Sequence, residues 1–209
     1  MVSFMLDFLV SPLFLLFARL CVGGVFVVSG VGKFLDKAGT EASMARYLFL
    51  PRGSGKFIAT FFPPIEFAVG LGLILGLLTR LAALGAILLF ALFTSLIIYD
   101  LARGKTESCH CFGKLSDDKL TPMAVVRNVF LMLLSLLVLL GFDGWMALDG
   151  ALTGGSTGLL VARTQPASLP DVANVVPVVL LSLFTVIVVV FGGQAVSMIR
   201  NTLRGLGFR

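Results

Sequence analysis

Two cysteines one residue apart, with a histidine between them, are the residues of this chain best suited to chemistry. Cys109, His110 and Cys111 lie where an apolar stretch turns abruptly polar. Two thiols at this spacing can form a small, strained disulfide, and strained disulfides have the raised reduction potentials of labile, catalytic or regulatory bridges. A protonated His110 would favour the thiolate, which is the species that exchanges. We therefore predict thiol–disulfide chemistry at these residues.

Metal binding and simple packing are the alternatives for the same tripeptide. Thiolate and imidazole are soft ligands that suit copper(I) or zinc, but a tetrahedral zinc site needs a fourth ligand, which Cys109, His110 and Cys111 do not supply. As packing residues, the cysteines would only fill space at a helix end. Packing is also the favoured interpretation of Cys21, a lone thiol inside an apolar helix.

Three further candidates are charged residues inside apolar stretches. Arg19 lies near the middle of the first stretch, Glu66 well inside the second and Arg127 near the start of the fourth. A charge within a membrane is costly and marks a functional candidate by default. If Glu66 pairs with Arg19 or Arg127, the pair would be stable in a low-dielectric site. It would then fix helix packing, bind a quinone or relay protons during thiol oxidation.

The chain that carries these residues is strongly apolar. Of its 209 residues, 58% are hydrophobic and 13% charged, and the mean hydropathy is +1.05. Soluble domains carry about 25% charged residues. The apolar residues form blocks long enough to cross a hydrocarbon core of ~30 Å, and without the alternation of a barrel they are predicted to be helices. The five predicted transmembrane helices are 12–33, 57–78, 81–101, 123–142 and 172–199.

Basic residues are unevenly distributed around these helices. The first connection, counted from Lys33, holds five, the third holds four and the tail three, whereas the second and fourth hold one each. The positive-inside rule then places the N-terminus outside and the C-terminus, together with the cysteines, in the cytoplasm. The basic residues are scattered and lack interleaved aromatic residues, so we predict a lipid bilayer and not nucleic acid as their partner. Residues 36–47 are expected to form a short helix at the membrane surface.

The motifs resemble those of a known family in a consistent order. Segments 19–33 and 64–80 are similar to the first two helices of the DoxX-like membrane proteins. Cys109-His-Cys-Phe-Gly, followed by Arg127-Asn128, resembles the MauE branch, the methylamine-utilisation membrane proteins. The resemblance runs from about residue 11 to 142.

This resemblance implies a domain organisation. Residues 1–142 would be an all-α, four-helix transmembrane bundle of the DoxX type. A Gly- and Ser-rich loop, 143–171, would connect it to an additional transmembrane helix and basic tail, 172–209.

The resemblance also implies a redox-associated role in the bacterial inner membrane. MauE-like proteins are linked to the maturation of disulfide-rich periplasmic proteins beside a thioredoxin-like partner, and DoxX relatives suggest exchange with quinone. Cys109 and Cys111 would then be the redox pair, with Glu66, Arg19 and Arg127 lining the bundle nearby. A periplasmic partner conflicts with the cytoplasmic placement of the cysteines. The alternatives are a copper- or zinc-binding protein and an assembly factor without catalysis.

Overall fold

The computed structural model describes residues 11–45, 54–104, 122–141 and 172–205. Within these ranges the chain forms helices and no strands. Five of the helices are long and apolar enough to cross a membrane, which confirms the all-α membrane fold with a fifth, C-terminal helix. The helices are α2 (Pro12–Leu35), α3 (Lys37–Ala45), α4 (Ser54–Leu75), α5 (Thr79–Ala102), α6 (Pro122–Gly141) and α8 (Val172–Gly205).

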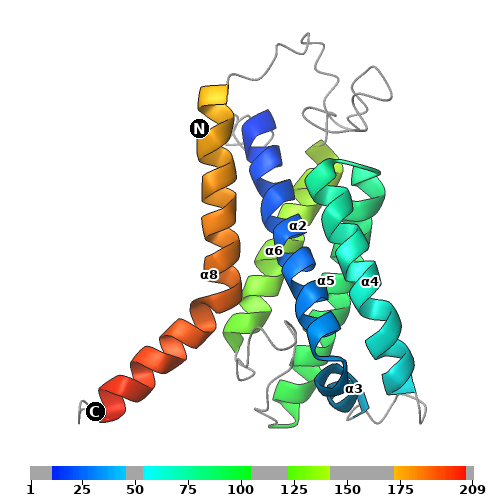
Figure 1. The fold of residues 1–209 in the computed structure, drawn as a ribbon, viewed down its shortest axis with the longest axis vertical. Coiled ribbons are helices and arrows are strands. Elements are labelled where there is room, and N and C mark those ends of the chain that lie inside the picture. The colour runs from blue at the N-terminus through cyan, green and yellow to red at the C-terminus, as the bar shows by residue number, and fades with distance from the viewer. Residues whose placement is uncertain (1–10, 46–53, 105–121, 142–171, 206–209) are drawn as a thin grey trace.

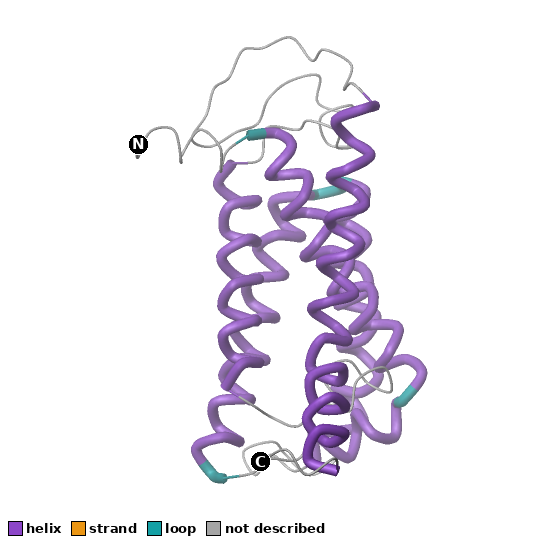
Figure 2. Tube along the Cα trace, turned by 90° about the vertical axis from the view of Figure 1, so that its left-hand side faces the viewer, coloured by secondary structure: helices purple, strands orange, loops and turns teal. Residues whose placement is uncertain are grey.

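The long helices run side by side in alternating directions, with α2 at the centre (Figures 1 and 2). Helix α2 contacts α3, α4, α6 and α8, whereas α5 packs against α4 and α6. Helices α2, α5 and α8 begin at one end of the bundle, and α4 and α6 begin at the opposite end, where the short α3 lies (Figure 1). We call this second end the α3 end.

Glycines bring α2 and α4 into close backbone contact. A Cβ atom added to Gly23 would lie 2.8 Å from the carbonyl oxygen of Gly70, and one added to Gly70 would lie 2.7 Å from that of Gly23. One added to Gly30 would lie 3.0 Å from the carbonyl oxygen of Pro63. Side chains do not fit at such separations, so α2 and α4 meet through the small residues that allow transmembrane helices to approach closely.

The turn between α4 and α5 ends the second span earlier than the hydropathy predicts. Helix α4 stops at Leu75 because Gly76 adopts a left-handed conformation with φ of 67°. The backbone N–H of Leu77 then donates to the carbonyl oxygen of Gly72 at 2.8 Å, the hydrogen bond of a Schellman helix end. Leu78, which hydropathy assigns to the second helix, also has a positive φ of 49° and caps α5.

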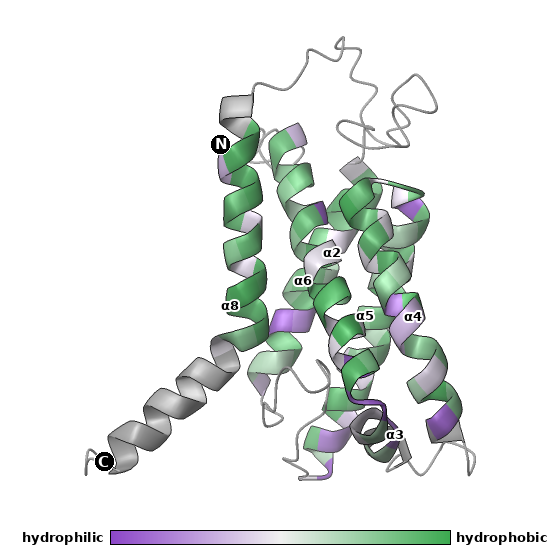
Figure 3. Ribbon diagram, in the orientation of Figure 1, coloured by the Kyte–Doolittle hydropathy of each residue, from purple (hydrophilic) through white to green (hydrophobic). Residues whose placement is uncertain are grey.

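Most described residues of the long helices are hydrophobic (Figure 3). Large side chains such as Leu81, Leu88, Leu133 and Phe184 are exposed along them. A soluble protein would bury this much apolar surface. The exposed faces therefore indicate a lipid environment, and the few buried polar groups inside the bundle become the residues of interest.

Candidate functional site

Cys109, His110 and Cys111 lie outside the described residues. The helices that flank them in the chain are described: α5 ends at Ala102 and α6 begins at Pro122. Both of these helix ends lie at the α3 end of the bundle (Figure 1). The redox and metal assignments of the tripeptide stay predictions.

A buried carboxylate at the α2–α4 interface has two side-chain partners. Glu66 is fully buried, and its Oε1 atom forms an ion pair with Nζ of Lys33. The hydroxyl of Ser29 donates a hydrogen bond to Glu66 Oε2 at 2.9 Å. Ser29 and Lys33 are four residues apart on α2, so both point from one face of that helix toward α4. We call these three residues the Lys33–Glu66 cluster.

An aromatic ring completes the environment of the ammonium group. Lys33 is 3% exposed, and its Nζ lies 4.3 Å from the ring centroid of Phe93 on α5. Cation–π attraction at this distance stabilises a desolvated ammonium group. The carboxylate, the hydroxyl and the ring together offset the desolvation that burying both charges costs.

The expectation that Glu66 would pair with Arg19 or Arg127 is therefore wrong. The partner is Lys33, which the charge count placed in the first connection but which belongs to the last turn of α2. The spacing of Ser29 and Lys33 on one helical face was the available signal. Removing Lys33 from the connection leaves four basic residues there and does not change the orientation favoured by the charge count.

Arg19 instead stabilises the C-terminal end of α4. Its Nε donates to the carbonyl oxygen of Leu73 at 3.0 Å, and one terminal nitrogen donates to that of Ile74 at 3.4 Å. The last carbonyls of a helix lack intrahelical donors, and a cation at this end complements the helix dipole. Leu73 is seven residues beyond Glu66, or about 10 Å along the helix. Arg19 thus acts at a different level of the bundle from the Lys33–Glu66 cluster.

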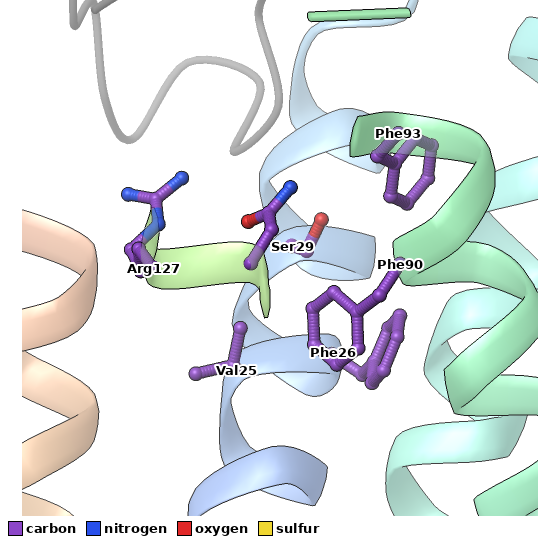
Figure 4. A pocket seen from close by; sticks show the side chains of 7 residues that line it. Val25, Phe26, Ser29, Phe90, Phe93 and Arg127 are labelled. Atoms are coloured by element: carbon purple, nitrogen blue, oxygen red, sulfur yellow. The ribbon is translucent and has the colours of Figure 1, made fainter. Parts of the chain in front are cut away.

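Arg127 lines a small cavity between α2, α5 and α6 that also reaches the cluster. One guanidinium N–H of Arg127 donates to the carbonyl oxygen of Val189 on α8 at 3.2 Å. Ser29 faces the same cavity from α2, and Phe93 faces it from α5 (Figure 4). The cavity has a volume of about 20 Å³, and its remaining lining residues are Val25, Phe26, Phe90 and Asn128.

The size of this cavity bears on the expected quinone. A volume of about 20 Å³ holds roughly one water molecule. The quinone expected near Glu66, Arg19 and Arg127 stays a prediction, and we assign no step to it. For metals, the described part of the chain contains no group of three or more His, Cys, Asp or Glu side chains.

Cys21 is buried against α8. Its thiol lies 3.9 Å from the carbonyl oxygen of Ser182, within reach of a weak hydrogen bond. The neighbouring Gly24 supports the same contact, since a Cβ added there would meet Val186 of α8 at 2.8 Å. These contacts agree with the interpretation of Cys21 as a small packing residue.

Comparison with known proteins gives a consistent result. The family model described as methylamine utilisation protein MauE matches residues 11–141. The chain is similar to the methylamine utilization protein MauE of Paracoccus denitrificans, with 29% identity over 161 residues, which covers 77% of this chain and 86% of that protein. No solved structure matches. The region matched by the family model contains α2 to α6, and α8 lies beyond it.

Proposed function

The chain belongs to the MauE family of membrane proteins, and on this premise we propose that it is a thiol–disulfide relay in which Cys109 and Cys111 exchange with a thioredoxin-like partner. The relay passes redox equivalents on to a second thiol protein and so supports the maturation of exported, disulfide-containing proteins. The name of the relative from Paracoccus denitrificans suggests methylamine utilisation as the setting.

One observation carries this proposal. The only pair of neighbouring thiols in the sequence lies in the connection between α5 and α6. The described ends of those helices are at the α3 end of the bundle, where α2 also ends with Lys33 in its last turn. A charged cluster inside a membrane bundle is the kind of feature that marks a functional site. We therefore propose that Cys109 and Cys111 act at the end of the bundle where α5 ends and α6 begins.

The exchange proceeds in two balanced steps. The thiolate of one cysteine attacks the disulfide of the partner, so that a mixed disulfide forms, the partner's own S–S bond breaks and its leaving sulfur takes up a proton. The second cysteine, as a thiolate, attacks the mixed disulfide, which forms the Cys109–Cys111 bridge and releases the partner as a dithiol. The partner gains two electrons and two protons, and this chain loses the same number. The reverse sequence reduces Cys109–Cys111.

The proposed location is the bacterial inner membrane with the α3 end in the cytoplasm. The described residues at or near this end include the basic side chains Lys37, Lys56 and Arg103, as the positive-inside rule requires. Labelling intact cells with a membrane-impermeant maleimide, with and without prior reduction, tests this orientation. Labelling only after permeabilisation is expected, and labelling of intact cells would reverse it.

Trapping a mixed disulfide tests the function itself. We expect the single variants Cys109→Ser and Cys111→Ser to differ, with one of them accumulating a mixed disulfide with an oxidised thioredoxin-like protein. The remaining thiolate attacks the partner's disulfide, and no second cysteine of the pair is left to resolve the product. The double variant should trap nothing. Cys21→Ser is the matched control and should behave as wild type, because Cys21 is buried against α8. Unchanged maturation of exported disulfide proteins in cells that carry only the double variant would overturn the proposal.

A further inference from the structure

Helix α8 is longer than a membrane span needs. Its span from Val175 to Gly192 has 18 residues, none of them charged. At 1.5 Å per residue this span covers about 27 Å, close to the ~30 Å thickness of a hydrocarbon core. The helix then continues to Gly205. Residues 193–205, which we call the α8 extension, therefore begin near the boundary between the hydrocarbon core and the lipid headgroups.

The sequence of the α8 extension is amphipathic, unlike that of the span before it. Its polar residues are Gln194, Ser197, Arg200, Asn201 and Arg204. At 3.6 residues per turn, these five positions fall within about one third of the helix circumference. The rest of the circumference carries its large apolar residues, Val196, Met198, Ile199 and Leu203. Such a separation is typical of a helix that lies between water and an apolar phase.

The backbone of the α8 extension runs away from the bundle. Figure 1 shows the C-terminal part of α8, drawn in red, leaving the other helices obliquely at the α3 end. The contacts of α8 with the bundle at Ser182, Val186 and Val189 come from the span that precedes the extension. The pair Gly192-Gly193 joins the two parts, and helices often kink at pairs of small residues. The extension is thus directed away from the helices that could cover its apolar side.

The charge of the α8 extension is positive. Arg200 and Arg204 are four residues apart and therefore share one side of the helix, and α8 contains no Asp or Glu. Because the preceding span lies in the bilayer, the anions within reach at this depth are the phosphates of lipid headgroups. The charge and the apolar side of the extension therefore both fit an anionic lipid surface.

We propose that residues 193–205 lie in the membrane interface as an amphipathic helix and bind anionic phospholipids of the leaflet at the α3 end. The apolar side enters the boundary of the acyl chains, and Arg200 and Arg204 pair with headgroup phosphates. Interfacial helices combine a basic, polar side with an apolar side in this way. Arginine suits the role because its guanidinium group binds phosphate through two parallel hydrogen bonds. The binding involves neither the cysteine pair nor the Lys33–Glu66 cluster.

Nitroxide labels on the full chain in liposomes of phosphatidylcholine and phosphatidylglycerol test where the helix lies. The three native cysteines are replaced by serine. Ile199→Cys and Leu203→Cys then report the apolar side, and Ser197→Cys and Asn201→Cys report the polar side. We expect labels on the apolar side to be accessible to oxygen, and labels on the polar side to be accessible to a water-soluble nickel complex.

Two other patterns of accessibility would overturn the proposal. If all four labels are accessible to the nickel complex, the helix lies in water. If the labels are accessible to neither reagent, protein covers the extension, either the bundle or a second copy of the chain.

Removal of the arginines tests the preference for anionic lipid. In the anionic liposomes, Arg200→Gln/Arg204→Gln should lower the ratio of membrane-bound to water-exposed label at Ile199→Cys by about 25-fold, since each arginine near an anionic surface contributes about fivefold. In liposomes of phosphatidylcholine alone, the same change should have little effect. A wild-type ratio in the double variant, or equal ratios for the unsubstituted helix in the two lipids, would contradict the proposal.

Arg103→Gln is the matched control for this measurement. It removes a positive charge at the same end of the bundle, where Arg103 follows α5 and lies over the ring of Tyr99. The ratio should stay at its wild-type value, and a loss as large as that of the double variant would assign the effect to net charge and not to the α8 extension. Because the chain lacks its cysteines and both leaflets have the same lipids, the outcome depends neither on thiol exchange nor on the orientation of the protein.

Discussion

The bundle buries positive charge at two levels and stabilises it in two different ways. Arg19 donates to the backbone carbonyls of Leu73 and Ile74 at the end of α4. Lys33 is paired with a second ionisable side chain, Glu66, beside a cavity. Both side chains are almost completely buried, so burial alone does not distinguish them.

The difference lies in what each partner can do. The acceptors of Arg19 are backbone carbonyls at the end of α4, so its contacts are those of a helix cap. Glu66 is a charged side chain, and it is linked through Ser29 to a cavity that reaches α6. The role of a charged residue inside a span is therefore better inferred from the group that it pairs with than from its presence in the span alone.

The largest effect is expected from removing one member of the ion pair. Lys33→Met leaves Glu66 buried without its counter-charge, and we expect the free energy of unfolding to fall by about 3–5 kcal/mol. SDS unfolding in mixed micelles measures the loss. The double variant Lys33→Met/Glu66→Leu removes both charges and should recover most of the stability. A double variant no more stable than the single one would show that the pair does not behave as a unit.

Removal of Arg19, which donates to the last carbonyls of α4, should cost less stability than removal of Lys33 and should not affect thiol–disulfide exchange. Arg19→Met leaves two carbonyl oxygens without donors, and we expect a loss of about 1.5–3 kcal/mol in the free energy of unfolding. The yield of trapped mixed disulfide per folded molecule should not change. A folded Arg19→Met protein that fails to trap would place Arg19 in the functional site and break the distinction between the two levels.

Both levels depend on the close approach of α2 and α4. Gly23→Ala adds a Cβ atom 2.8 Å from the carbonyl oxygen of Gly70, so the helices must separate, and overpacking of this kind costs about 1–3 kcal/mol. Gly192→Ala is the matched control, because its nearest neighbour, Val188, lies at an ordinary 3.7 Å. Equal unfolding free energies for the two variants would mean that the α2–α4 contact is not limiting.

The smallest effect is expected at the ring beside the ammonium group. Phe93→Leu keeps an apolar side chain but removes the π face, and we expect a loss of about 1 kcal/mol in the free energy of unfolding. Phe93→Trp, which keeps a π face, should lose less. In a Lys33→Met background the cost of Phe93→Leu should shrink, and an unchanged cost would assign the effect to packing alone.

Hydropathy was sufficient to predict the five spans, because lipid leaves the backbone no alternative to a helix or a closed barrel. The short surface helix expected over 36–47 is present as α3. The end of α4 was misplaced because the left-handed turn at Gly76 is a local backbone feature inside a continuous apolar run.

The partner of Glu66 was not predictable from hydropathy. Lys33 is the last charged residue of an apolar stretch, and a lysine in that position usually reaches toward the interface. Its burial depends on Glu66, which is distant in sequence and is brought opposite by the glycine contacts between α2 and α4. Asn128 was noticed only as part of a motif, and its place on the cavity wall shows only once α2 and α5 are packed beside α6.

The contacts of α8 have a consequence for the order in which the protein is made. Helices α2 to α6 precede α8 in the chain, so the contact of Gly24 with Val186 and the hydrogen bond from Arg127 to Val189 form only after α8 has been inserted. Before that step, the helices that carry the Lys33–Glu66 cluster are already present, but the contacts of α8 with α2 and α6 are still missing. Insertion of α8 therefore completes the contacts of α2 and α6 with this helix.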